Sequence, residues 1–488
     1  MTGSGRSWRR RSSLRVLVGL LLAAGSGQAA TAGAERLLAA PAGDRPAIPP
    51  VLAQSAPARS SSPSPPAWQP IIEQIEVRGN TRTPAGDAIV VAELREGGPA
   101  SAHLIQAAAE RLRQSHLFQE VSVHTRPGSA PGHLIVVFDV SESRPSLRLG
   151  VGYEDLSGWY LIPVQLNLDN LSGHGEHFDL SARFGFRLQG LVLTHRRPSL
   201  TDPRCFWELA LRAESQNRIY FHRDAEISHR VGASGIDLAL GRPVTRHVAL
   251  TAWASYEKLE PDSSAEVYQA QDAEDLESGD NLPFAELPPG VQASLAARTQ
   301  GRFGLALGLD TRESTGVRRR GVWGHLMGEA IVGEAGDFQR AEWDLRAYAP
   351  LLERAGIAVR TRLGAVSQAA PFFQRYYLGG LYTVRGFPNQ SLSPADGSLQ
   401  FAVASAELRA AWIGPPDDPL LTGIVFLDYG LGWNHGRPDL AAGAASVGYG
   451  FRLRVPWIGR FGLDIGRPVT PSPVDEAFHI NGSIGWSF

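Results

Sequence analysis

The sequence predicts a transmembrane β-barrel of sixteen antiparallel strands, preceded by one α+β domain. The main observation is an alternation of apolar residues with glycine or polar residues, which continues from about Leu147 to Phe488. From Val447 to Val455, every odd position is apolar and every even position is glycine or arginine. Segments of about ten residues with one apolar and one polar face suit strands that stand between lipid and a wet lumen. A soluble β-sandwich also alternates, but its buried face does not carry repeated arginine and aspartate.

Residues 1–32 are predicted to be a secretory signal peptide. Several arginines precede the apolar stretch from Val16 to Ala24, and the small residues up to Ala32 have the form of a cleavage site. About nine apolar residues are too few for a helical membrane anchor, which needs roughly 20. Residues 33–69 are rich in Pro, Ala and Ser and contain too little bulky apolar material for a core, so we expect a disordered linker.

Residues 70–143 are predicted to form the α+β domain, in the order strand, helix, helix, strand, strand. The alternating segment "IIEQIEVRGN" ends in a turn, and Thr83 with the proline after it is expected to cap the first helix. The second helix is expected after Ser101, with Ile105, Ala108 and Leu112 on one face. Strands at "LFQEVSVHT" and "HLIVVFDVSE" complete the domain.

Residues 146–488 are predicted to form the barrel, and an even number of strands returns the last strand to the side where the first began. Loops after odd strands then lie on the side opposite the α+β domain and should be the longer ones. The longest polar connection, from about Glu257 to Gly290, follows the seventh segment. The glycine-rich loop "LGGLYTVRGFPNQ" follows the eleventh. In the last strand, "HINGSIGWSF", Trp486 and Phe488 lie on the apolar face.

Composition and motifs argue against several functional classes. The net charge of −2 gives no basic footprint for nucleic acid. Lys258 is the only lysine and follows a glutamate, so the chain has no phosphate-binding P-loop. Cys205 is the only cysteine, which excludes an internal disulfide and a Cys-based zinc cluster. Because G-x-S-x-G and H-E-x-x-H motifs are also missing from the sequence, we expect no enzyme, no cofactor and no metal site.

Four stretches make the chain resemble the outer-membrane protein-insertion porin superfamily, which includes the BamA/TamA family and two-partner-secretion transporters such as FhaC. The first is "IEVRGNTRTP" with "RLRQSHLFQEVSV" and "LIVVFDVSE", and the second is "LGVGYEDLSGWYLIPVQLNLDNLSGHGE" with "RRPSLTD". The third is "GLDTRE" and the fourth is "VRGF". The resemblance implies that residues 70–143 are a single polypeptide-transport-associated (POTRA) domain in the periplasm. It also implies that the barrel lies in the outer membrane of a Gram-negative type cell.

The most specific of these stretches is V-R-G-F, the signature of the sixth extracellular loop of that superfamily. The resemblance implies that this loop folds back into the barrel and that its arginine pairs with inward acidic residues. A guanidinium suits this role because its planar fork binds a carboxylate bidentately and keeps its charge. The motif residues are Val384, Arg385, Gly386 and Phe387, and the matching acidic residues are Asp428 and Glu407.

The resemblance further implies an outer-membrane polypeptide transporter or insertase that receives unfolded proteins through the POTRA domain. Clients are expected to add a strand to the domain edge at Phe118, Val121 and Val123, because backbone pairing tolerates varied sequence. Trp486 and Phe488 are the expected C-terminal barrel signal. Expected partners are unfolded outer-membrane or secreted proteins, outer-membrane lipid and accessory assembly proteins, and the barrel is expected to be monomeric. One POTRA domain favours a specialised transporter. The alternative is a passive or gated outer-membrane pore with a structural role.

Overall fold

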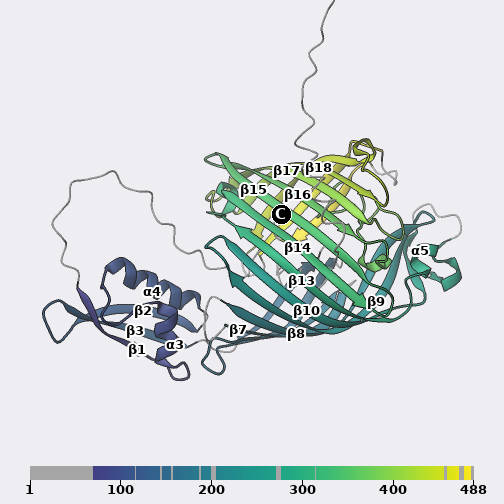
Figure 1. Ribbon diagram of the computed structural model, residues 1–488. Helices are drawn as coiled ribbons and strands as arrows, with labels where there is room; N and C mark the ends of the chain where they lie inside the picture. Colours follow the sequence, from purple (N-terminus) through teal and green to yellow (C-terminus); the bar gives the residue numbers. More distant parts are fainter. Residues whose placement is uncertain are drawn as a thin grey trace, which may run out of the picture.

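The structure of the chain is a computed structural model that describes residues 70–484 apart from gaps at 116, 143–145, 155–157, 186–187, 199–204, 271–275, 314, 456–458 and 472–476. The predicted signal peptide (1–32), the linker (33–69) and the terminal residues Trp486 and Phe488 lie outside the described residues. Within the described part, an α+β domain is followed by a large β-barrel (Figure 1).

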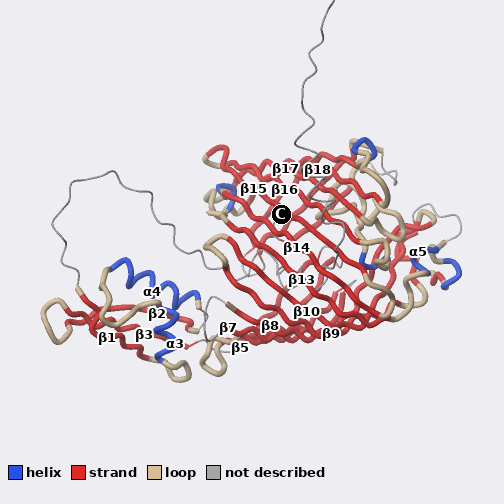
Figure 2. The backbone as a smooth tube through the Cα atoms, in the orientation of Figure 1, coloured by secondary structure: helices blue, strands red, loops and turns tan. Residues whose placement is uncertain are grey.

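The α+β domain consists of a three-stranded sheet with two helices packed against it (Figure 2). Strand β3 is central, and it pairs parallel with β1 and antiparallel with β2. The predicted order of strand, helix, helix, strand and strand is confirmed. The elements are β1 (Ile71–Arg78), α3 (Ala85–Ala92), α4 (Ala102–Gln114), β2 (Phe118–Pro127) and β3 (His133–Glu142).

The local sequence explains the start of α4 but not the start of α3. Helix α4 starts after Ser101 as predicted, and the hydroxyl of Ser101 caps it by accepting a hydrogen bond from the N–H of Leu104 at 3.2 Å. The prediction that Thr83 caps α3 is wrong: the cap position is Pro84, and no side-chain hydrogen bond caps this helix. The hydroxyl of Thr83 is instead used by a tertiary contact, since it accepts a hydrogen bond from Asn170 of the barrel.

The barrel is one large sheet in which strands that follow each other along the chain pair antiparallel. The order of the sheet places β21 beside β4. The strands are β4 (Ser146–Glu154), β5 (Gly158–Asp169), β6 (His177–Gly185), β7 (Leu188–Pro198), β8 (Phe206–His222), β9 (Ala225–Pro243), β10 (Val248–Pro261), β13 (Arg298–Asp310), β14 (Gly321–Gly333), β15 (Phe338–Leu352), β16 (Ala355–Val366), β17 (Gln400–Ile413), β18 (Leu421–Trp433), β19 (Ala444–Val455), β20 (Gly459–Pro468) and β21 (His479–Ile484). Short 3-10 turns occur at η2 (Gly316–Arg318), η3 (Phe372–Gln374) and η4 (Leu440–Ala442).

Side chains of the barrel strands alternate between an exposed apolar face and a buried, more polar one. On β13, Phe303 and Leu305 are exposed whereas Arg302, the residue before Phe303, is fully buried. On β19, Val447 and Leu453 are exposed whereas Arg452 is fully buried. The outward face therefore suits lipid, and the inward face carries charge. In the described ranges, the helices are too short or too polar to cross a bilayer.

The connection after β10 differs from the polar loop predicted from Glu257 to Gly290. Glu257 belongs to β10 and is buried inside the barrel, where it accepts hydrogen bonds from Arg212 and Arg302. The prediction was wrong because a charged residue at an inward-facing strand position has the same polarity as a loop residue. The connection itself contains β11 (Ala265–Ala270), β12 (Asn281–Leu282), η1 (Phe284–Glu286) and α5 (Pro289–Gln292).

A turn of the barrel holds the α+β domain. In the turn between β5 and β6, Asn170 is fully buried, and its Nδ2 donates hydrogen bonds to Thr83 Oγ1 at 2.7 Å and to the carbonyl of Leu117 at 3.0 Å. In the same turn, His174 Nδ1 lies 2.7 Å from Asp87 Oδ2. The β5–β6 turn thus marks the end of the barrel that faces the α+β domain.

Candidate functional site

The glycine-rich loop between β16 and β17, residues 367–399, lies inside the barrel. Its stem is closed by an antiparallel backbone pair between Tyr376 and Ser398. Most residues from Phe372 to Leu392 are buried, although they form a loop without strands. A loop usually runs over the protein surface. The burial of this one means that it is held by specific partners on the barrel wall.

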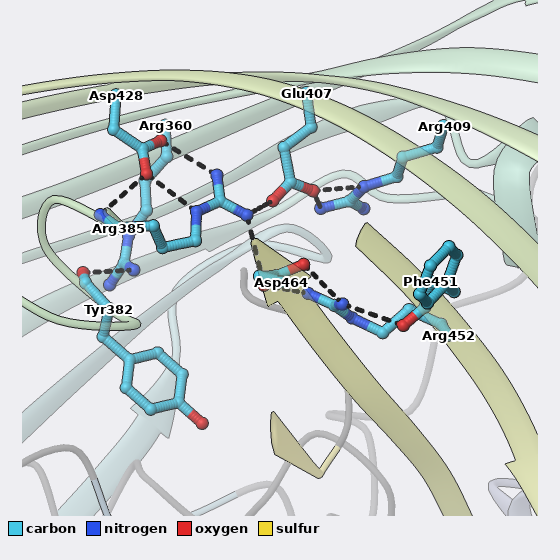
Figure 3. Close-up of polar contacts among 9 residues, drawn as sticks. All are labelled: Arg360, Tyr382, Arg385, Glu407, Arg409, Asp428, Phe451, Arg452 and Asp464. Carbon is cyan, nitrogen blue, oxygen red and sulfur yellow. Dashed lines mark hydrogen bonds and ion pairs between the residues drawn. The ribbon is translucent and has the colours of Figure 1, made fainter. Parts of the chain in front are cut away.

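Arg385 is the centre of those contacts and its side chain is 1% exposed (Figure 3). Its Nε and Nη2 donate hydrogen bonds to the two carboxylate oxygens of Asp428 at 2.7 and 2.9 Å. Its backbone N–H donates to the same carboxylate at 3.1 Å. Its Nη1 donates to Glu407 Oε1 at 2.6 Å and lies 3.5 Å from Asp464 Oδ2. The guanidinium also stands 3.6 Å from the ring centroid of Phe426, where the ring face attracts a cation.

Two further arginines balance the charge of this cluster. Arg409 Nε donates to Glu407 Oε2 at 2.8 Å, and Arg452 donates to both oxygens of Asp464 at 2.8 and 2.7 Å. Three cations therefore meet three anions, and each of these six side chains is almost completely buried. Buried charges need such compensation because an unpaired one is costly in a low-dielectric interior. The six are Arg385, Arg409, Arg452, Glu407, Asp428 and Asp464.

Glycines let the loop backbone touch the wall. Gly386 has φ +89°, and a Cβ there would lie 2.9 Å from the carbonyl carbon of Gly466 on β20. A Cβ on Gly466 would in turn lie 2.5 Å from the backbone nitrogen of Gly386. A Cβ on Gly430 of β18 would lie 2.4 Å from a methyl group of Val384. Both backbones therefore need glycine where they meet.

The loop has further attachments on either side of the cluster. Val384 and Phe387 of the predicted motif are both fully buried. The carbonyl of Tyr382 accepts a hydrogen bond from Arg360 Nη1 at 3.4 Å (Figure 3). Arg360 Nη2 in turn donates a hydrogen bond to Asp344 at 2.8 Å. These contacts tie the loop to β15 and β16 as well as to β17, β18 and β20.

The stem of the loop packs into an apolar cluster shared with the connection after β10. Phe372 is fully buried, and its ring makes an edge contact with that of Tyr220 on β8, the centroids being 5.9 Å apart. The cluster also includes Ile227 of β9, Val267 of β11 and Val291 of α5. Loop segments that are far apart in sequence are therefore joined at the end of the barrel remote from the α+β domain (Figure 1).

Sequence reasoning named Arg385, Asp428 and Glu407, and the structure brings these three side chains together. It did not name Asp464 or Arg452 as members of the site. Both occupy inward positions on strands with clear alternation, which is the signal that makes them candidates. Periodicity does not indicate at which height along the barrel axis an inward side chain lies, so it does not select these two from other inward charges.

The predicted client-binding residues lie on β2, an edge strand of the domain sheet. The side chains of Phe118 and Val121 are buried in the domain core, and Val123 packs against it. They are therefore not free to contact another chain. Only the backbone of β2 is placed to pair with an added strand.

One helix side chain occupies part of that edge. Arg113 of α4 donates hydrogen bonds to the carbonyl of Val121 from Nε at 3.1 Å and from Nη2 at 2.9 Å. Because the carbonyl of Val121 accepts these hydrogen bonds from α4, it is not directed at β3. We therefore infer that the backbone N–H and C=O of Val121 face the open edge. N–H and C=O groups of alternate residues point to the same side of an antiparallel strand, which directs those of Val123 and Thr125 to the edge as well.

Comparisons with known proteins agree on one family. Residues 170–488 match the Omp85 superfamily domain. The chain is 22% identical over 388 residues to the outer membrane protein assembly factor BamA of Nitratidesulfovibrio vulgaris, a match that covers 74% of this chain and 44% of that protein. The chain thus spans less than half the length of this relative.

Two solved structures are similar in fold. The structure of BamA from Haemophilus ducreyi lacking POTRA domains 1–3 has a TM-score of 0.65 and 18% identity, with 85% of this chain and 84% of that chain covered. CdiB from Acinetobacter baumannii has a TM-score of 0.53 and 12% identity, with 85% of this chain and 73% of that chain covered. The β-barrel architecture is common to all three.

Proposed function

The chain belongs to the Omp85 superfamily, and on this premise we propose that it is a polypeptide transporter or insertase of the outer membrane. The resemblance expected from its sequence motifs is confirmed, and the chain is an outer-membrane protein. The observation that carries the proposal is the loop held inside the barrel by the buried Arg385 cluster. A passive pore needs no loop that obstructs its interior and is anchored there through Arg385 to charged residues of the wall.

We propose that residues 70–143 are a POTRA domain that receives unfolded polypeptide in the periplasm. The strand, helix, helix, strand, strand order and the contact of the domain with the β5–β6 turn support this assignment. Clients pair with the edge of β2 rather than with that of β1. The first part of β1 is already covered, because the N–H of Ile72 donates to the carbonyl of Gly98 at 2.8 Å and that of Ile75 donates to Glu96 Oε1 at 3.0 Å.

We further propose that the barrel has sixteen membrane-spanning strands and acts as a monomer. The count is supported in the described ranges by β4 to β10 and β13 to β21. Strands β11 and β12 are left out of it because β11 pairs with the end of β9 beyond the part of that strand that β10 covers. The proposal assigns the chain no enzymatic step, and work on the client comes from folding and binding, because the sequence has no nucleotide-binding motif.

The proposed activity is tested with the full chain reconstituted in liposomes. An unfolded outer-membrane protein is added outside, and its insertion is followed by the appearance of its heat-modifiable folded band. We expect insertion to be faster than in liposomes that contain the Arg385→Ala variant or no protein. Equal insertion rates in all three sets of liposomes would contradict the proposal that the chain is an insertase.

Secretion is tested separately, by the protease sensitivity of a soluble client at the cell surface. The passive pore is distinguished by conductance in planar bilayers. The buried loop predicts small, fluctuating currents, which deletion of residues 376–396 should enlarge. Large and steady currents through the intact protein would favour the pore.

A further inference from the structure

We propose that a polar pocket on the outward surface of the barrel, at the end remote from the α+β domain, binds the sugar part of a membrane glycolipid. The pocket lies over β7, β8 and β9 and has a volume of about 340 Å³. It does not include the Arg385 cluster, and it does not depend on the transport function proposed above.

The outward surface of these three strands changes from apolar to polar at one height. On one side of the change, the outward side chains are exposed and apolar, as in Leu191, Leu211 and Ile236. On the other side they are polar, as in Gln189, Ser215 and Arg230. Gln189 lies opposite Ser215 in the pairing of β7 with β8, so the change occurs at the same level on both strands. Such a border is expected where the hydrocarbon of the bilayer ends and the headgroups begin.

The pocket lies at the outer border of the membrane. Its residues cluster where β6 joins β7 and where β8 joins β9, as well as beside β11. The β5–β6 turn, which contacts the α+β domain through Asn170, is at the opposite end of these strands. In an outer-membrane barrel with a periplasmic domain, the pocket therefore opens at the level of the outer leaflet, whose lipids carry sugars on their headgroups.

The pocket has a floor and a wall with fixed polar groups. On the floor, Arg230 Nε donates a hydrogen bond to Ser215 Oγ at 2.8 Å, and Asn217 Nδ2 donates to Ser228 Oγ at 2.9 Å. The wall is formed by β11 and β12, since Glu266 of β11 lies opposite Ser228 of β9 and is paired with Asn281 of β12. These contacts orient the hydroxyl, amide and guanidinium groups before a ligand arrives.

The chemistry of the lining favours a sugar over other ligands. Hydroxyls, amides, carboxylates and one guanidinium supply both donors and acceptors, which suits a polyhydroxylated ligand. Arg230 is accompanied by Asp262 and Glu266, so a strongly charged ligand of either sign meets repulsion. The volume lies within the range of roughly 300–1,000 Å³ of sites for small molecules. Exposed leucines directly beside the pocket give the acyl chains of a glycolipid an apolar surface.

The test uses the full chain in phosphatidylethanolamine nanodiscs with and without an uncharged diacyl glycolipid that carries an oligosaccharide headgroup, and native mass spectrometry to measure bound glycolipid. Ser215→Leu and Asn217→Leu extend the apolar surface into the pocket and are expected to weaken binding about tenfold, which corresponds to the loss of one or two hydrogen bonds. Ala213→Leu is the matched control, because Ala213 is an exposed outward position on the same strand and does not line the pocket. Folding of each variant is verified by its heat-modifiable band.

The source of the sugar is identified with the free oligosaccharide that forms the headgroup of the same uncharged glycolipid. Competition at concentrations far above those of the glycolipid supports a sugar site filled from the membrane. Equal affinity for free oligosaccharide and glycolipid would overturn the membrane source and assign the pocket to soluble saccharides. Unchanged binding in both pocket variants, or equal loss in Ala213→Leu, would overturn the site.

Discussion

Arg385 meets Asp428 through three donors, its Nε, its Nη2 and its own backbone N–H, at 2.7, 2.9 and 3.1 Å. The backbone contact places the loop main chain against the same carboxylate that the side chain binds. Since Arg385 also reaches Glu407, one side chain joins the loop to both β17 and β18. Arg385 therefore anchors the loop to two strands of the wall at once.

Arg385→Ala is expected to release the loop without unfolding the barrel. The change leaves three buried carboxylates facing two cations, so that Asp428 loses its arginine partner, and losing one member of a buried pair costs about 3–5 kcal/mol. Strand pairing and the lipid-facing side chains are untouched, so the heat-modifiable band should persist. Added protease should cleave the loop in intact cells, and client transport should fall. Wild-type transport together with a protected loop would show that Arg385 is dispensable.

Two controls sharpen this experiment. Arg223→Ala removes an exposed arginine whose pair with Glu286 is worth at most about 1 kcal/mol, and should leave the loop protected. Exchanging the charges with Arg385→Asp and Asp428→Arg should not restore transport, because the new aspartate would face Glu407 and Asp464. Recovery by the exchange would mean that Asp428 alone holds the arginine.

Alanine at Gly386 or at Gly466 is expected to displace the loop by different means. Gly386→Ala adds a methyl group 2.9 Å from the wall and also strains a φ of +89°, the strain costing about 1–3 kcal/mol. Gly466 has an ordinary φ, so Gly466→Ala adds no such strain and only places a methyl group 2.5 Å from the loop backbone. Gly336→Ala is the control, because its φ is +107° but a Cβ there has nothing within 4 Å. Loop cleavage by protease in the first two variants and not in the third would separate contact from backbone strain.

Proline at Val123 is expected to weaken client binding by the α+β domain while the domain stays folded. The N–H of Val123 faces the open edge by our inference, so its loss removes a bond to the client and none to β3. Val123→Thr keeps the N–H and is the matched control. Arg113→Ala should strengthen binding, because it frees the carbonyl of Val121. Binding of an unfolded client is measured by fluorescence anisotropy, and equal affinity for the proline and threonine variants would argue against strand addition.

Asn170→Ala is expected to loosen the attachment of the α+β domain. The change leaves the hydroxyl of Thr83 and the carbonyl of Leu117 without this partner, at a cost of about 1–3 kcal/mol. Spin labels at exposed Gln106 and Val244, in a background where Cys205 is replaced by Ser, should give a broader distance distribution than in the wild type.

The matched control for Asn170 is Asn80→Ala. Asn80 donates a hydrogen bond to the carbonyl of Thr83 at 2.8 Å within the domain and has no part in the turn. Its distance distribution should stay narrow. A distribution that is equally narrow in Asn170→Ala would show that other contacts fix the domain.

The α+β domain is expected to lose stability in acid through Glu142. Burial by itself raises the pKa of Glu142, but hydrogen bonds from Thr83, Arg82 and Thr81 outweigh it and hold the pKa below its usual range. A lowered pKa in the folded state means that this stabilisation is present above the unfolded pKa of about 4.3 and is lost as pH falls below it. Urea unfolding followed by the helical circular dichroism signal should therefore depend less on pH in Glu142→Gln. An unchanged dependence would place the acid sensitivity elsewhere.

The sequence by itself determined which face of each strand a residue occupies. Because successive side chains of a strand point to opposite sides, alternation placed Glu407 and Asp428 inward and their neighbours outward. It also determined the element order of the α+β domain and the start of α4 after Ser101. These are local properties, set by spacing and by side chains a few residues apart. The meeting of Arg385 with Asp428 and Glu407 was expected only through the family resemblance.

Only the tertiary structure decided which inward side chains share one height in the barrel. Strand tilt and register bring part of β20 beside the loop. For this reason Asp464 of β20 contacts Arg385, and a Cβ on Gly466 would collide with the loop backbone. The same holds for Thr83, whose hydroxyl binds Asn170, 87 residues along the chain, instead of capping α3. The position of Glu257 in the barrel wall is a third such case, since its partners Arg212 and Arg302 come from other strands. Contacts of this kind depend on how distant segments are brought together, which the period of a strand does not encode.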